Sequence, residues 1–302
     1  MANREHLARA LWTLFEPIHA VTYFSDEARA AFASIGLPRY WDGYFAGRSA
    51  PLGAVSGAPV VAIFSGFAPM LVNRALPAAW EVASPAAVIE ARYAGAESTL
   101  RKLVPDESIV AAAADALVPI ARVVDTIGRP LAAANAALSE SDDPYRRLWQ
   151  AAATLREHRG DGHVIALVSL EIAGISTLLL RSGLDLDATS MQKARGWTDE
   201  EWAASADDLI ARGLLGADGR ITDDGRYKLE EAEELTNMLA AAPLRKFSKE
   251  ILLGTARALA PIARAVGDLF PYPNPIGMPK PWDPDSDPEA TAISEVPESP
   301  EA

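Results

Sequence analysis

The sequence predicts a mainly α-helical protein with one short β-hairpin. Apolar residues recur at three- and four-residue spacing over most of the chain, which is the period of a helix that buries one face. Ser, Thr or Asp precedes many of these segments and Gly follows several of them, as expected of helix caps. One Asp-Gly pair between short apolar runs interrupts this pattern and predicts the hairpin.

Residues 1–142 are predicted to form an N-terminal multi-helix domain. Ser25 is a good N-cap for its second helix, and Ser84 with Pro85 begins a later one. Residues 59–76 are apolar but contain Gly66 and Pro69, so they predict two short helices or one bent helix. A short aromatic segment covers residues 40–46. The other helices expected here are residues 6–21, 26–36, 84–103, 106–124 and 130–138.

Residues 143–270 continue the helical pattern. Pro144 follows the capping residue Asp143 and begins a helix that we expect to end at Gly160 and Gly162. A long apolar helix is expected to follow and to stop at Gly183. The later helices expected are residues 161–181, 186–195, 199–212, 225–241 and 243–270.

The run from 196 to 225 predicts a winged helix-turn-helix. Thr198 is an N-cap with Glu201 as its capping-box partner, and Gly213 can end the helix in a left-handed conformation. Asp218 and Gly219 supply the tight turn of the hairpin. The helix over residues 199–212 then stands where a recognition helix would stand, so residues 143–270 are assigned to this domain with its flanking helices.

The last stretch, 271–302, is rich in Pro and acidic residues and is expected to be largely disordered, because it has little apolar surface to bury. Disorder is expected above all for residues 283–302. Its aromatic and apolar residues are the exception, since they could lie across the folded body as an extended strap. These residues are Tyr272, Pro273, Ile276 and Trp282.

Composition limits the partners that the sequence favours. With 302 residues and 49% hydrophobic residues, there is material for two compact cores. The formal net charge of -13 repels polyphosphate on average, so nucleic acid is a doubtful partner. The chain has no cysteine, no secretory pattern and no apolar run suited to a bilayer, so we expect a cytoplasmic protein without a membrane partner.

Two resemblances follow from local motifs. Residues 186–239 resemble the winged-helix domain of MarR-type regulators in ARGLL, DGRIT and the following DGR. The whole chain is similar to an actinobacterial family of two-part helix-turn-helix proteins in EPIHAVTYF (16–24), YWDGYFAGRSAPLG (40–53) and HRGDGH (158–163). The MarR resemblance implies a homodimer that binds DNA through its recognition helix and wing and responds to small aromatic or phenolic ligands.

The surface that would face DNA departs from that pattern. Between Thr198 and Arg226 the chain has eight acidic residues against three basic ones. Acidic side chains on a recognition helix would meet phosphates, so we expect this surface to be a poor DNA reader. A DNA-binding regulator remains the alternative, and its phosphate contacts would be Arg195, Arg212, Arg220 and Arg226.

An aromatic cluster near the N-terminus is the preferred functional site. Three- and four-residue spacing places its first group on one helix face, and a second aromatic group follows closely. An apolar, aromatic wall with a few polar groups is typical of a small-molecule pocket, although the same stripe could be ordinary core. The predicted ligand-binding residues are Trp12, Phe15, Glu16, His19, Tyr23, Tyr40, Trp41, Tyr44, Phe45 and Arg48.

A metal- or haem-dependent enzyme is the third reading. Glu16 and His19 have a Glu-x-x-His spacing, but no second such pair occurs. His158, His163 and Asp161 are weak candidates for a two-histidine, one-carboxylate metal site, and His19 could serve as an axial haem ligand. No nucleophile motif or phosphate loop appears, so the sequence identifies no cofactor and no catalytic residue, and an enzyme is the less favoured class.

Overall fold

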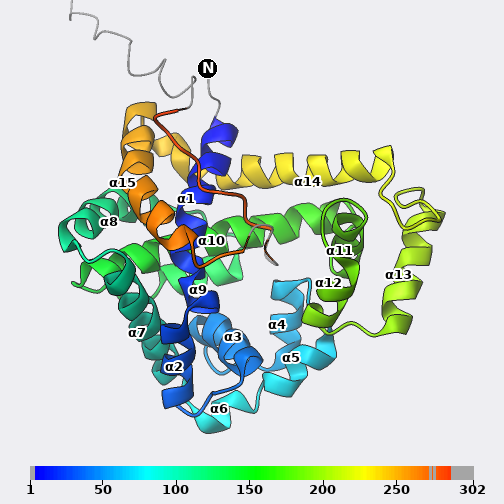
Figure 1. The fold of residues 1–302 in the computed structure, drawn as a ribbon, viewed down its shortest axis with the longest axis horizontal. Helices are drawn as coiled ribbons and strands as arrows, with labels where there is room; N and C mark the ends of the chain where they lie inside the picture. Colours follow the sequence, from blue (N-terminus) through cyan, green and yellow to red (C-terminus); the bar gives the residue numbers. More distant parts are fainter. Residues whose placement is uncertain (1–3, 272–273, 275–276, 287–302) are drawn as a thin grey trace, which may run out of the picture.

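The computed structural model describes residues 4–271, 274 and 277–286, and there the protein is mainly α-helical, as predicted (Figure 1). Across these residues no helix combines the length and the apolar character that crossing a bilayer requires.

The first part of the chain forms short and medium helices that follow the predicted capping signals. Ser25 and Ser84 accept hydrogen bonds from the first turns of the helices they precede. Residues 59–76 form two short helices rather than one bent helix. The elements are α1 (Arg4–Phe24), α2 (Asp26–Ser34), α3 (Tyr40–Ser49), the 3₁₀ turn η1 (Ala50–Leu52), α4 (Gly57–Phe64), α5 (Pro69–Ala75), α6 (Ala79–Val82), α7 (Pro85–Leu103), α8 (Glu107–Ala121) and α9 (Pro130–Ala136).

The second part differs from the prediction at its long helices. The elements are α10 (Pro144–Ser169), α11 (Ile175–Ser182), α12 (Ala188–Arg195), α13 (Asp199–Ala211), α14 (Asp223–Ala240), the 3₁₀ turn η2 (Pro243–Lys246) and α15 (Lys249–Gly267). The expected helix break at Gly160 and Gly162 was wrong, because α10 runs through both glycines. The expected single helix over 161–181 was also wrong, since the chain turns at Glu171 with a positive φ of 59°.

Packing explains why these glycines do not end the helix. A Cβ atom at Gly162 would lie 2.6 Å from Nη1 of Arg129. That same nitrogen donates a hydrogen bond of 2.7 Å to the carbonyl oxygen of His158. Gly162 therefore provides space for a guanidinium that approaches the backbone of α10, rather than a helix stop.

The main hydrophobic cluster surrounds α10 and is built from α1, α7, α8, α10 and α15. Trp149 and Tyr145 of α10 are among its largest fully buried side chains. The cluster includes residues from both sides of the expected domain boundary near Asp142, and that boundary stays a prediction. A second cluster packs α3, α4, α5 and the neighbouring turns around Phe45, which is fully buried.

The region predicted to be a winged helix contains α11, α12, α13 and the beginning of α14, and we call it the winged-helix part after that prediction. It has its own small cluster around Leu209 and Leu180. The capping box of Thr198 and Glu201 forms as predicted, and Gly213 has a φ of +72°. The predicted hairpin is not shown among the described residues. Leu215 and Ile221 pair in an isolated antiparallel bridge, in which the Gly216 N–H donates to Arg220 and the Thr222 N–H to Leu214. The backbone N–H of Ile221 faces away from Leu215 and donates to Gly183.

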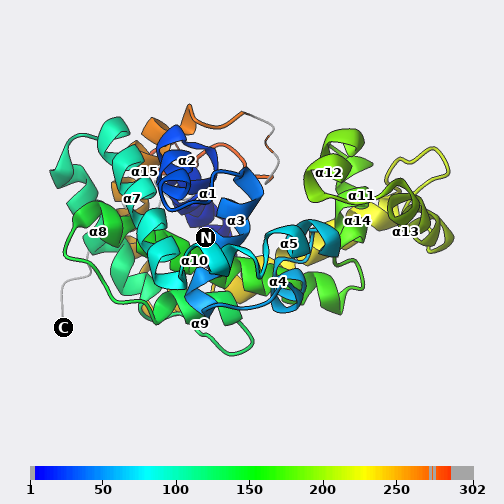
Figure 2. The same ribbon diagram turned by 90° about the horizontal axis from the view of Figure 1, so that it is seen from below.

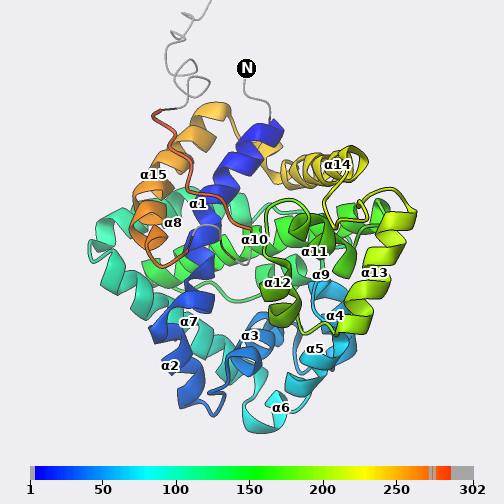
Figure 3. The same cartoon turned by 45° about the vertical axis from the view of Figure 1, so that its right-hand side comes forward.

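α11, α12 and α13 lie at one end of the molecule, where α14 reaches back toward α1 and α15 (Figures 1 and 2). The loop between α4 and α5 meets α12 at the other side of this region (Figure 3). There the Ala68 N–H donates to the carbonyl of Arg195 at 2.9 Å, and the Trp197 indole donates to Gly66 at 3.1 Å. The winged-helix part is thus attached to the helical body at two places.

The described part of the C-terminal segment lies along α1 (Figure 1). Met278 is buried in the main cluster, and the Trp282 N–H donates to Oγ1 of Thr13 at 2.9 Å. The predicted strap residues Tyr272, Pro273 and Ile276 lie outside the described residues, as do residues 287–302 of the tail expected to be disordered.

Candidate functional site

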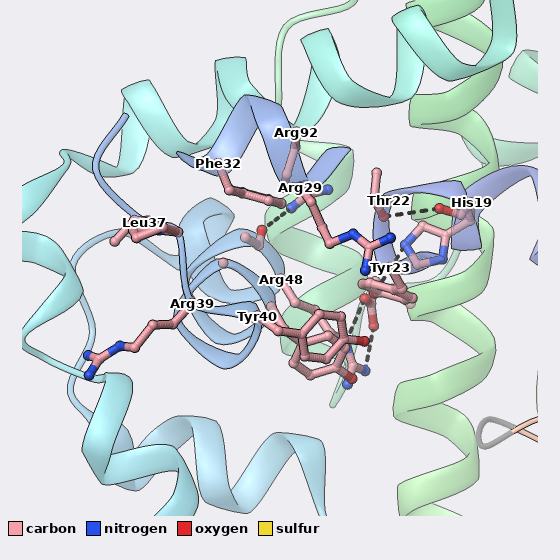
Figure 4. A pocket seen from close by; sticks show the side chains of 15 residues that line it. His19, Thr22, Tyr23, Arg29, Phe32, Leu37, Arg39, Tyr40, Arg48 and Arg92 are labelled. Carbon is pink, nitrogen blue, oxygen red and sulfur yellow. Dashed lines mark hydrogen bonds and ion pairs between the residues drawn. The ribbon is translucent and has the colours of Figure 1, made fainter. Parts of the chain in front are cut away.

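A pocket opens where α1, α2 and α3 meet, and we call it the α1–α3 pocket (Figure 4). Its lining side chains come from these three helices, with Arg92 added by α7 and Glu157 by α10. Its cavity volume is about 30 Å³, which is room for two or three waters at roughly 10–15 Å³ each.

Aromatic side chains form one wall of the pocket. Tyr23 of α1 and Tyr44 of α3 have ring centroids 5.0 Å apart, and Tyr40 stacks on Tyr44 at 6.2 Å. Phe32 of α2 forms the opposite side. Tyr40 is 43% exposed and lies at the mouth, whereas Phe32 is buried. The wall therefore offers ring faces and edges to a planar guest.

Two glycines allow α2 and α3 to approach closely beside the pocket. A Cβ atom at Gly43 would lie 3.1 Å from the Phe32 ring, and one at Gly47 would lie 2.7 Å from its Cζ. Since Gly43 and Gly47 are four residues apart, they share one face of α3. That face is a groove into which the Phe32 ring fits.

A buried ion network lies beneath the pocket. Nε and Nη2 of Arg48 donate to the two carboxylate oxygens of Glu157, each at 2.9 Å. Nη1 of Arg156 donates to Oε2 of the same carboxylate at 2.8 Å, and Nε of Arg156 contacts Glu16 at 3.4 Å. Burial opposes ionisation of Glu157, but the charges of Arg156 and Arg48 outweigh it and hold its pKa well below the usual range.

Arg92 is the second buried guanidinium of the pocket and is 6% exposed. It donates to the carbonyl of Gly47 at 2.7 Å and to Oδ1 of Asn135 at 3.2 Å, and its Cζ lies 4.9 Å from the centroid of Trp149. Both hydrogen-bond acceptors are neutral. Within the described chain Arg92 makes no ion pair.

His19 contributes a buried imidazole to the same pocket. It is 2% exposed and stacks on Trp149, and its Nε2 lies 3.4 Å from the hydroxyl of Tyr23. Its Nδ1 is buried without a hydrogen-bond partner among the described residues. Burial and the nearby charge of Arg156 lower the pKa of His19 well below its ordinary value, so the ring is neutral at pH 7.

The structure separates the ten predicted ligand-binding residues into several environments. Five line the α1–α3 pocket: His19, Tyr23, Tyr40, Tyr44 and Arg48. Trp41 and Phe45 pack behind that wall in the second cluster, and Phe15 belongs to the main cluster. Trp12 and Glu16 line a different, larger cleft, which faces the winged-helix part.

Sequence reasoning missed Arg92, Glu157 and Phe32 as pocket residues. Arg92 stands alone on the otherwise small and apolar face of α7, and this was a usable signal. The Gly-x-x-x-Gly spacing of Gly43 and Gly47 also indicated a close helix contact. By contrast, no local pattern links Glu157 to Arg48, which is 109 residues earlier.

The surface of α13 is exposed and acidic. Among its outward side chains are Asp199, Glu200, Asp207 and Asp208, and Leu209 is its one buried residue. The wing turn that follows carries Arg220, whose side chain is 86% exposed. α13 thus has the placement of a recognition helix with the charge of a surface that phosphates repel.

Comparison with known proteins gives the family. The model of a protein family described as "Helix-turn-helix family" matches residues 8–271, which is most of the chain. This protein belongs to that helix-turn-helix family. No curated protein and no solved structure matches it. Membership of the family covers the body as well as the winged-helix part, and the finer resemblance to MarR-type regulators stays a prediction.

The four arginines of the DNA-binding alternative are not equivalent in this family member. Arg195 points into the molecule, where its Cζ lies 4.4 Å from the centroid of Phe67. Arg212 pairs with Asp208 and donates to the carbonyl of Glu171. Arg220 is exposed beside Asp218, and Arg226 lines the cleft. Arg195 is therefore not available to a partner that binds at α13, whereas the exposed Arg220 is.

The cleft lined by Trp12 and Glu16 lies between the helical body and the winged-helix part. Its volume is about 920 Å³. Its lining includes Arg159, which stacks on Trp12 at 4.5 Å and pairs with Glu233 of α14 at 2.6 Å. Acidic and basic side chains alternate along it, and several are paired with each other.

The weak metal candidates do not gather into a site. His158 is 1% exposed, Asp161 accepts a hydrogen bond from the Ala132 N–H, and Nδ1 of His163 contacts Thr236. Among the residues that the structure describes, no group of three or more His, Cys, Asp or Glu could hold a metal ion. For haem, the space of about 30 Å³ beside His19 is far too small for a porphyrin.

Proposed function

We propose that this helix-turn-helix family protein binds a small, single-ring aromatic ligand in the α1–α3 pocket. The observation that carries the proposal is the combination of an aromatic wall with a buried polar floor. Tyr23, Tyr44 and Phe32 supply the wall, while His19 and Arg48 supply groups that can orient a guest. Pockets of this composition are the usual form of small-molecule sites.

The size of the pocket restricts the ligand. A cavity of about 30 Å³ restricts the ligand to a small molecule and excludes fused polycyclic molecules and tetrapyrroles. Tyr40, which is 43% exposed at the mouth, leaves a route from solvent. The ligand is therefore a small planar molecule that enters past Tyr40.

Thermal-shift and calorimetric titration with single-ring aromatic compounds test this function. Ligand at about ten times its Kd adds about 1.4 kcal/mol to the free energy of unfolding of the wild type. Tyr44→Leu, which removes a wall ring, should reduce that gain. Tyr227→Leu is the matched control, because Tyr227 is 65% exposed on α14. Lack of stabilisation by any such compound, or equal stabilisation of the Tyr44 variant, contradicts the proposal.

A DNA-binding regulator is the second candidate, favoured by family membership and by the exposed position of α13. The acidic side chains of α13 argue against it, and Arg195 is engaged with Phe67. Mobility-shift titration at two salt concentrations decides between the two. A specific complex with strong salt dependence would contradict our expectation that the α13 surface is a poor DNA reader.

We also propose a homodimer, on the strength of the MarR resemblance. Light scattering coupled to size exclusion measures the mass in solution directly, and a monomer at micromolar concentration would contradict this assembly.

A further inference from the structure

The buried guanidiniums at the α1–α3 pocket differ in their partners. Glu16, Glu157 and Asp161 are the buried carboxylates near Arg48, Arg92 and Arg156, and none of them pairs with Arg92. Arg48 and Arg156 pair with Glu157 and Glu16, and Arg92 has only neutral acceptors. An uncompensated buried charge is unfavourable unless a counter-charge approaches it.

From this guanidinium without a carboxylate partner we infer that the ligand is an anion: a single-ring aromatic carboxylate whose negative group lies against Arg92. The inference rests on the proposed function of the same pocket and specifies its ligand class. Arg92 lines the pocket as well as the cluster beneath it. A carboxylate there balances the third guanidinium, and the ring lies between the walls of Tyr23 and Phe32.

The mouth of the pocket is also rich in arginine. Arg29 of α2 and Arg39 before α3 line it, each paired with an acidic neighbour on its own helix. With Arg48 and Arg92, the lining contains four arginines and one glutamate. Because Arg29, Arg39 and Arg48 each pair with a carboxylate, Arg92 is the arginine of this lining that a ligand carboxylate would pair with.

The experiment compares benzoate with benzamide, which has nearly the same shape and is neutral at pH 7. Calorimetric titration of the full chain should show benzoate binding at least about tenfold more tightly than benzamide. Because the contact is buried, benzoate affinity should change little between 50 and 300 mM salt, unlike that of a surface ion pair.

Substitutions of Arg92 locate the contact. Arg92→Met should weaken benzoate binding about tenfold or more and leave benzamide unchanged. Arg92→Lys keeps the charge, so it should retain part of the preference for benzoate and remains informative if the Met variant folds poorly. Arg74→Met is the matched control, since it makes the same change of charge on α5 outside the pocket.

Each outcome separates this inference from the proposed function. If benzamide binds as tightly as benzoate, or if Arg92→Met binds benzoate like the wild type, the anionic ligand class is wrong while the aromatic pocket stands. If neither compound binds and no other single-ring aromatic compound does, the proposed function fails and the inference fails with it.

Discussion

Glu157 accepts hydrogen bonds from two guanidiniums while it is 2% exposed. Glu157→Gln keeps the shape of the side chain but leaves Arg48 and Arg156 without their shared counter-charge. Breaking a buried ion pair by removing one partner costs about 3–5 kcal/mol. We expect a loss of about 3 kcal/mol in the free energy of unfolding, measured by urea denaturation at pH 7.

Glu90→Gln is the control for that measurement, because Glu90 pairs with Arg146 and its side chain is 60% exposed. Exposed pairs contribute about 0–1 kcal/mol, so this variant should unfold close to the wild type. Equal losses in the two variants would show that the buried network has no special role in stability.

Buried histidines predict acid sensitivity. Burial and the charge of Arg129 lower the pKa of His158 to about 4, whereas an unfolded histidine has a pKa near 6.5. Between pH 6.5 and 4 the unfolded state therefore binds the extra proton, and stability falls as the pH falls through this window. His163, also with a pKa lowered to about 4, acts in the same direction.

Asp161 acts in the opposite direction, because burial raises its pKa to about 6 and the folded state takes up its proton first. Its contribution to stability is present below pH 3.8 and is lost as the pH rises toward 6. His19, His158 and His163 together outweigh one aspartate, so urea midpoints should drop from pH 6.5 to pH 4.5. His158→Gln should flatten that dependence, and an unchanged slope would contradict the assignment.

At the scale of the helices, the sequence predicted those features, such as helix caps, that depend only on residues close together in the chain. The caps at Ser25, Ser84 and Thr198 form as expected, because a cap needs only its own first turn. The role of Gly162 was not predictable, since it depends on Arg129 approaching from another helix. The hairpin is limited to one bridge, because Thr222 directly after it already caps α14.

Gly47 tests the helix contact that shapes the pocket. In Gly47→Ala the new methyl would lie 2.7 Å from Cζ of the buried Phe32 ring, so α2 and α3 must separate or the ring must move. Overpacking of this kind costs about 1–3 kcal/mol. We expect lower stability in thermal melts together with weaker binding of an aromatic ligand.

Gly254→Ala is the matched control within α15, where a Cβ would meet nothing within 4 Å. Alanine is favoured over glycine in a helix interior by about 0.5–1 kcal/mol, so this variant should be slightly more stable than the wild type. A Gly47 variant that gained stability in the same way would show that the Phe32 contact is not tight.

At the scale of the whole molecule, sequence periodicity placed five pocket residues on the helices where they lie. It could not show which of these helices meet at the site. Arg48 and Glu157 meet across 109 residues, and Arg92 arrives from a third helix. Arg195 shows the same limit. Its position before the recognition helix suggested a phosphate contact, yet it faces Phe67 because α12 docks against the loop after α4.

That docking gives a physical route from the pocket to the winged-helix part. Tyr44 lines the pocket, its ring centroid lies 5.4 Å from that of Phe67, and Phe67 stacks under Arg195 at the end of α12. A ligand that orders Tyr44 should therefore slow amide hydrogen exchange in residues 64–68 and 188–197. α15, on the opposite side of the body, serves as the internal reference.

Phe67→Leu should interrupt this route without removing a pocket residue, because Phe67 does not line the pocket. We expect ligand affinity within about threefold of the wild type, since smaller effects are usual for residues outside a binding site. The ligand-dependent protection of 188–197 should disappear, while that of Tyr44 and its neighbours remains. Protection of 188–197 that persists in this variant would mean that the coupling passes through another contact, such as the Ala68–Arg195 hydrogen bond.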